Sequence, residues 1–159
     1  MQTAEADDLP LPASLLENPP FLMLQILRAG KRMAEERPEG PRLPHMAILA
    51  SLVEFGPQSQ RDLGRRLGFD PSDVVRLIDA LERDGHAERR RDPDDRRRNA
   101  VVVTDAGRAW LEERLATTRE RLQVFLGGLD EDERDQLLRL LQRALAHLDG
   151  RVPEGYRTV

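Results

Sequence analysis

Residues 59–107 read SQRDLGRRLGFDPSDVVRLIDALERDGHAERRRDPDDRRRNAVVVTDAG, and the predicted fold follows from them. It opens with Ser59 and Asp62, which have the spacing of a capping box in which each side chain satisfies a backbone donor at a helix start. Gly68 stands where a left-handed turn can end that helix at little cost. We therefore predict a short helix of about two turns.

A second helix is predicted to start directly afterwards. Asp70 is placed to cap it, Pro71 suits its first position, and Gly85 ends it. Its apolar residues recur at the spacing that gives one buried stripe: Val74, Leu77, Ile78 and Leu81. The opposite side presents polar or small residues: Ser72, Asp73, Arg76, Asp79, Ala80 and Arg83. Two helices joined by a short glycine-containing turn are typical of a helix-turn-helix, whose second helix enters the major groove of DNA.

The residues after Gly85 predict a β-hairpin. Residues 88–91 and the valines at 101–103 have strand character, and residues 92–95, Asp-Pro-Asp-Asp, favour chain reversal between them. A hairpin that directly follows the second helix makes a winged helix. The predicted fold class is therefore mainly α with a small β-hairpin.

This stretch resembles the multiple antibiotic resistance regulator (MarR) family. The wing hallmark of that family is an Asp-Pro-x-Asp-x-Arg run, then a strand and a Leu-Thr-x-x-Gly helix start. Here the run begins at Asp92, and Val103-Thr104 and Gly107 follow. The resemblance is continuous through the preceding helix-turn-helix, and looser agreement in helix lengths extends from about residue 19 to residue 148. It implies a dimeric winged helix-turn-helix transcriptional regulator.

The remainder of the chain predicts a helical dimerisation region. Residues 18–42 and 104–150 carry more apolar side chains than one helical face needs, which suggests a subunit interface. Within residues 43–103, the winged helix-turn-helix region, a further helix should run from about Pro44 to Phe55 with Met46, Leu49 and Val53 inward. Residues 1–17 are interpreted as a mobile arm and residues 151–159 as a tail, so that the whole forms one compact domain.

The composition excludes several classes of protein. The 159 residues have a formal net charge of −4, which argues against a uniformly basic coat for nucleic acid and places any DNA contact in local patches. There is no cysteine, so thiol sensing and disulfides are excluded. Neither a membrane span nor a signal peptide is evident, and we expect a soluble cytoplasmic protein. The three histidines lie on separate predicted elements without a nucleophile or metal-ligand pattern, so we expect no enzyme, cofactor or metal site.

The predicted second helix carries the candidate base contacts: Ser72, Asp73, Val75 and Arg76. Arg76 is the first candidate for guanine, because a guanidinium can bond both O6 and N7; the alternative is a phosphate contact or a solvated side chain. Asp73 either accepts from cytosine N4 or caps its helix, and capping is favoured. Family members often carry Ser or Thr where this chain has Val75, which either contacts a thymine methyl or only packs.

The wing and the first helix carry the candidate backbone contacts. The resemblance implies that Arg97 is the minor-groove arginine. Asp95 is interpreted as structural, either holding the wing tip or pairing with a neighbouring arginine, and not as a DNA contact. Arg96, Arg98, Arg89 and Arg90 are candidates for phosphate contact, with solvated charge as the alternative. Ser59, Gln60 and Arg61 lie at a predicted helix N-terminus, where backbone N–H groups and the helix dipole favour an anion.

These residues together predict a homodimer that binds double-stranded DNA at a palindromic operator, most simply as a repressor. The resemblance also implies release by a small aromatic or lipophilic ligand, for which His45 and Trp110 are the pocket candidates; for His45 a solvated or capping role is favoured over a ligand or metal role. The alternative is a helical dimer that serves as an architectural or protein-interaction module without specific DNA reading.

Overall fold

The computed structural model describes residues 9–35, 42–91 and 99–156. The chain divides into two compact units, Met1–Gly40 and Pro41–Val159. The first unit holds α1 (Ala13–Leu16) and α2 (Pro19–Glu35). Asn18 caps the start of α2, because its side-chain oxygen accepts a hydrogen bond of 3.1 Å from the Phe21 N–H. The short helix α1 lies in the stretch interpreted from sequence as an arm, and it was not predicted.

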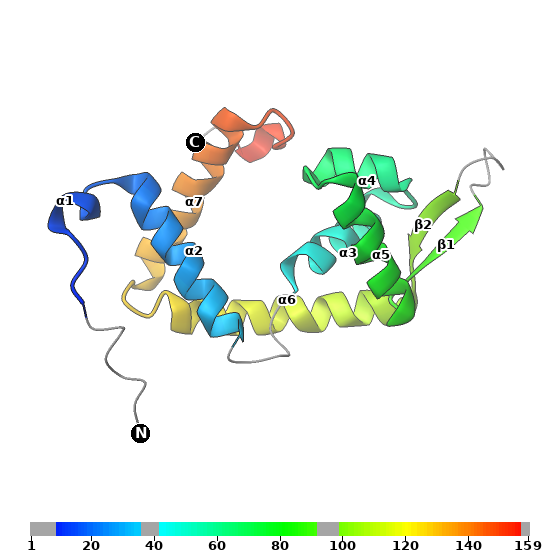
Figure 1. The fold of residues 1–159 in the computed structure, drawn as a ribbon, viewed down its shortest axis with the longest axis horizontal. Helices are drawn as coiled ribbons and strands as arrows, with labels where there is room; N and C mark the ends of the chain where they lie inside the picture. The colour runs from blue at the N-terminus through cyan, green and yellow to red at the C-terminus, as the bar shows by residue number, and fades with distance from the viewer. Residues whose placement is uncertain (1–8, 36–41, 92–98, 157–159) are drawn as a thin grey trace, which may run out of the picture. The chain divides into compact units, whose positions relative to one another are not determined.

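The second unit contains the winged helix and the two long C-terminal helices (Figure 1). Its elements, in chain order, are α3 (Leu43–Phe55), α4 (Gln60–Leu67), α5 (Pro71–Arg83), β1 (Ala87–Arg91), β2 (Asn99–Val103), α6 (Asp105–Phe125), α7 (Glu131–Leu148) and the 3₁₀ turn η1 (Glu154–Tyr156). The predicted fold class is confirmed: the unit is mainly helical, with an antiparallel hairpin after the second helix of the helix-turn-helix.

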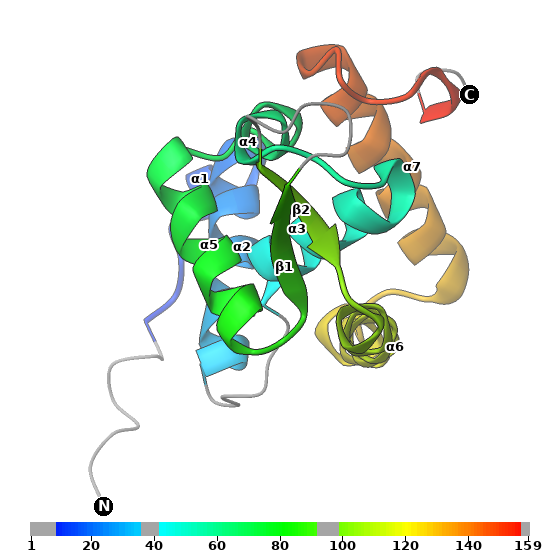
Figure 2. The same ribbon diagram turned by 90° about the vertical axis from the view of Figure 1, so that its right-hand side faces the viewer.

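The hairpin is joined to the rest of the unit by a third extended segment. In β1 and β2 Ala87 faces Val103 and Arg89 faces Val101. Gln58, just before α4, exchanges two backbone hydrogen bonds of 2.8 and 3.2 Å with Val101. Figure 2 shows the hairpin lying against α3, with α6 beginning where β2 ends. The start of α4 is therefore tied directly to the wing.

One hydrophobic core holds α3, α4, α5 and the hairpin together. Its largest fully buried side chains are Ile48, Leu49, Leu52, Leu63, Ile78, Leu81, Val74 and Val101. Burying a side chain of this size stabilises the fold by about 1.5–3 kcal/mol, so these contacts dominate the local packing. The predicted apolar stripe of α5 is confirmed, since three of its four residues are buried and Leu77 is half-buried.

The prediction that Val53 points inward was wrong, because 42% of this residue is exposed. The buried stripe of α3 runs through Leu49 and Leu52, and the next residue is rotated by about 100° around the helix, away from the core. Met46 and Leu49 are buried as predicted.

Each of the two long helices begins at a side-chain cap. Thr104 caps α6, because its Oγ1 accepts from the Gly107 N–H at 3.0 Å. Asp130 and Glu133 form a reciprocal capping box at the start of α7, each side chain accepting from the other residue's N–H at 2.9 Å. None of the described helices is long and apolar enough to cross a lipid bilayer.

The chain returns to the helix-turn-helix after α7. The Arg151 guanidinium donates hydrogen bonds of 2.9 and 3.2 Å to the carbonyl oxygens of Arg65 and Arg66 in the last turn of α4. Its hydrogen bonds to Asp149 hold the pKa of that carboxyl at about 2. Arg151 therefore occupies carbonyls that a helix end leaves without a partner.

Candidate nucleic-acid interface

The start of α4 has the capping serine that its sequence predicts. Ser59 Oγ accepts from the Asp62 N–H at 3.2 Å and donates to Asp62 Oδ2 at 2.7 Å. The Asp62 carboxylate therefore binds the Ser59 hydroxyl, whereas a full capping box would place it on the Ser59 N–H. Gln60 and Arg61 are the first two residues of α4, and Arg61 is exposed.

The start of α5 is organised by Asp70. Asp70 Oδ1 accepts from the Ser72 hydroxyl at 2.6 Å and from the Ser72 N–H at 2.8 Å. These hydrogen bonds, the one from the hydroxyl first, lower the pKa of the Asp70 carboxyl. The cap of α5 is thus Asp70, as predicted, and a base contact by Ser72 would require its hydroxyl to leave Asp70.

Asp73 and Arg76 form an ion pair on the exposed surface of α5. Asp73 Oδ1 lies 2.6 Å from Arg76 Nη2, and 52% and 77% of the two side chains are exposed. The Asp73 carboxylate therefore holds a neighbouring guanidinium, a role that neither sequence-based alternative included. An exposed pair of this kind contributes about 0–1 kcal/mol, so DNA can compete for Arg76 at little cost.

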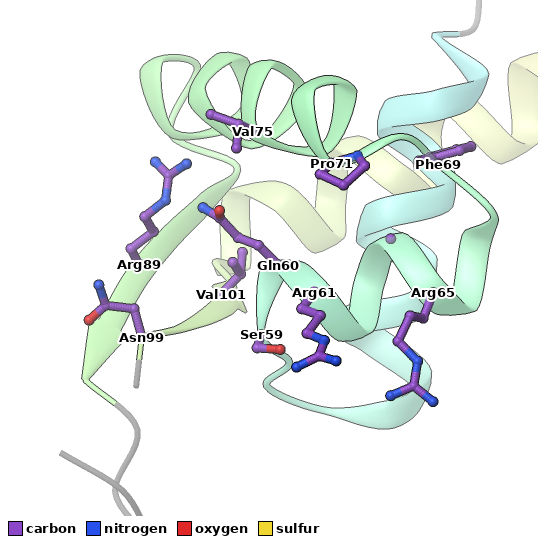
Figure 3. A pocket seen from close by; sticks show the side chains of 11 residues that line it. Ser59, Gln60, Arg61, Arg65, Phe69, Pro71, Val75, Arg89, Asn99 and Val101 are labelled. Carbon is purple, nitrogen blue, oxygen red and sulfur yellow. The ribbon is translucent and has the colours of Figure 1, made fainter. Parts of the chain in front are cut away.

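A groove lies between α4, α5 and the hairpin (Figure 3). Four candidate contacts to the DNA backbone and one candidate base contact meet there. The groove is lined by Ser59, Gln60, Arg61, Gly64, Arg65, Phe69, Pro71, Val75, Arg89, Asn99 and Val101. Val75 is 42% exposed, so its methyl groups are open to a partner. The N-terminus of α4 and one side of the recognition helix α5 therefore line the same groove.

The two candidate arginines of β1, Arg89 and Arg90, have different surroundings. Arg90 pairs with Glu88 on its own strand, and 64% of its side chain is exposed. Arg89 is 25% exposed and pairs with both Asp79 and Glu82 of α5. Arg89 therefore binds carboxylates within the protein, whereas the sequence suggested a contact with a DNA phosphate. The predicted contacts Arg96, Arg97 and Arg98, and the predicted wing-structuring Asp95, lie outside the described residues.

Sequence reasoning missed the partners of Arg89. Asp79 and Glu82 are three residues apart on α5 and so lie on one face of that helix, which was a usable signal for a common cation. Which arginine they bind depends on how the hairpin packs against α5, and spacing along the chain does not give that.

The two pocket candidates lie near a third aromatic side chain. The His86 ring is 5.1 Å from the Trp110 ring, and His86 also acts electrostatically on His45. Burial, and then the charge of Arg42, lower the pKa of His45. In the part of the chain that the structure describes, His45 Nδ1 is buried without a hydrogen-bond partner. His86 was not among the candidates.

The helices and hairpin around this groove define a winged helix-turn-helix protein. Residues 40–98 match the model of the MarR family. A probable transcriptional regulator from Pseudomonas aeruginosa has a similar crystal structure, with 33% identity and a TM-score of 0.67 over 82% of this chain and 98% of that chain. The chain belongs to the MarR family of winged helix-turn-helix transcriptional regulators.

Two further relatives agree with this assignment. The PcaV transcriptional regulator of Streptomyces coelicolor, whose structure was solved with its natural ligand, is 29% identical with a TM-score of 0.68 over 88% of this chain and 100% of that chain. YkoM of Bacillus subtilis, an uncharacterized helix-turn-helix transcriptional regulator, is 37% identical over 101 residues, which are 64% of this chain and 66% of YkoM. The chain spans 60% to 66% of the length of the first curated relatives that it matches.

Proposed function

We propose that this chain is a homodimeric transcriptional repressor that binds a palindromic operator. The observation that carries the proposal is the exposed N-terminal half of α5, where Val75 and Arg76 stand beside the groove at the start of α4. In helix-turn-helix proteins this half of the recognition helix reaches base edges.

The apolar side chains exposed on the long helices support the dimer. Several leucines of α6 and α7 are 41% to 54% exposed: Leu115, Leu122, Leu138, Leu140, Leu141 and Leu145. Exposed apolar side chains that gather on a protein surface often mark a protein–protein interface, and a second copy of the chain would cover these leucines. A two-fold axis would then place two recognition helices about one DNA turn apart, which requires a palindromic site.

We also propose that a small molecule binds to the protein and controls its affinity for DNA. The natural ligand bound by PcaV supports it, as do the aromatic side chains of Trp110 and His86 next to His45. A ligand can act only by favouring one spacing of the recognition helices over another. The test is a thermal-shift screen with phenolic and other aromatic acids, followed by operator release. A compound that does both supports ligand control, and a screen in which none does contradicts it.

The operator itself is tested by footprinting on genomic fragments, with the molecular mass of the complex measured by sedimentation. The proposal expects protection of a discrete palindrome by two chains. Salt-sensitive binding that is indifferent to sequence would contradict it and favour an architectural module.

A further inference from the structure

Arg89 of β1 is held by two carboxylates of the recognition helix. Its Nη2 lies 2.7 Å from Asp79 Oδ1, and its Nη1 contacts Glu82 Oε2. The Arg89 N–H also donates to Glu82 Oε1 at 2.7 Å, so backbone and side chain bind the same residue. A guanidinium with two carboxylate partners has its charge already compensated. It is therefore poorly suited to attract a phosphate on its own.

The extended segments bring Gln60 to this arginine. Gln58 is bonded through its backbone to Val101, and Val101 is the cross-strand partner of Arg89. Two residues after Gln58 the chain reaches Gln60, the first residue of α4. The Gln60 amide fits this site with its oxygen turned toward Arg89, and in that orientation the oxygen accepts hydrogen bonds of 2.8 Å from Arg89 Nη2 and 2.7 Å from Arg89 Nε. Figure 3 shows the two side chains facing one another at the groove.

This contact determines which end of the Gln60 amide is available to a ligand. A guanidinium has donors and no acceptor, so only the amide oxygen can face Arg89. The NH₂ group then occupies the other branch of the amide, in a half-buried side chain that lines the groove. It lies at a helix N-terminus, where the dipole and backbone N–H groups also favour an anion.

We propose that Arg89 is a positioning residue for DNA binding, which orients Gln60 so that its NH₂ group donates to a phosphate. The inference rests on the proposed function and adds a residue that touches no DNA itself. It also explains why a wing arginine is bound to the recognition helix. Arg89 links α4, α5 and β1, and it offsets the negative charge of Asp79 and Glu82 near the place where a DNA phosphate would bind.

Three variants of the full chain test this: Gln60→Ala, Arg89→Lys and the double variant, each titrated on the operator. Lysine keeps the charge and can reach Glu82, but its single ammonium cannot replace the planar fork that binds Asp79, Glu82 and Gln60 together. We expect each single variant to bind about three- to tenfold more weakly, the loss of one hydrogen bond. The double variant should bind no more weakly than the weaker single variant, because both remove the same contact.

Two further variants accompany these three. Gln60→Glu keeps an acceptor for Arg89 but has no donor, so it should bind the operator at least about tenfold more weakly, with its unfolding temperature preserved. Arg108→Lys, on the exposed surface of α6, should bind as the wild type does.

Several results would overturn the inference. Wild-type affinity in Arg89→Lys would do so, and so would losses that multiply in the double variant, because they would show that the two side chains act separately. A lower unfolding temperature of Arg89→Lys with unchanged affinity would leave Arg89 a purely structural role. If one of these results is obtained while the wild type still selects a specific operator, the role of Arg89 is wrong and the proposed function stands. If the wild type selects no operator, the proposed function fails as well.

Discussion

Gly107 of α6 packs directly against the carbonyl group of His86, so closely that a methyl group on Gly107 would lie 2.0 Å from the His86 oxygen. The same carbonyl accepts from the Thr104 N–H at 3.1 Å, and the Thr104 hydroxyl donates to the Gly85 carbonyl at 2.7 Å. The start of the long helix is thus joined to the turn between the recognition helix and the wing. Any movement of α6 must act on that turn.

Gly107→Ala should destabilise the fold. The backbone of His86 has to move away from the added methyl group, and such overpacking costs about 1–3 kcal/mol. The measurement is the midpoint of chemical unfolding. Gly128→Ala is the matched control, because a methyl group there meets nothing within 4 Å. Equal midpoints for the two variants would show that the contact at His86 is not a constraint.

Arg97→Ala should weaken operator binding without changing which bases are preferred. An arginine inserted in a minor groove displaces counterions from the DNA and is attracted by the negative potential of a narrow groove. Its loss should therefore also reduce the slope of log affinity against log salt concentration by about one. Titrations at several salt concentrations measure both quantities. Unchanged affinity and slope would remove the wing from the interface.

The stability of the fold should fall at mildly acidic pH because of His45. The pKa of His45 is lowered below its ordinary value of 6.5, so the unfolded chain binds the proton more tightly than the folded chain. Neutral His45 therefore contributes fully to the free energy of unfolding above pH 6.5, and this contribution is lost as the pH falls through the lowered pKa. Thermal unfolding between pH 8 and pH 5 should show a steeper decline for the wild type than for His45→Asn. Parallel curves would contradict this assignment.

The local features of the fold were predictable because they depend on neighbouring residues. Ser59, Asp70 and Thr104 cap the helices they were expected to cap, and the glycines at 68 and 85 have the positive φ that a helix end requires. Each of these signals acts within a few residues, so the sequence alone contains it.

Features that depend on packing between distant elements were not predictable. Val53 has an apolar side chain, yet the direction of the core around α3 depends on where α5 and the hairpin pack. Arg89 belongs to an arginine run that suggested phosphate contact. The packing of β1 against α5 brings it to Glu82, and the pairing of Gln58 with Val101 brings Gln60 to it. The link from Arg151 to the end of α4 joins positions 85 and 86 residues apart, with no local signal.

We propose that the exposed N-terminal half of α5 selects the DNA site. The most direct measurement compares the wild type with Arg76→Ala against a library of operators in which every base pair is varied. We expect Arg76→Ala to lose about 1–3 kcal/mol of discrimination between bases at one base pair in each half-site. Its base preferences at the other positions should be unchanged. A uniform loss of affinity over all sequences would contradict it and make Arg76 a phosphate contact.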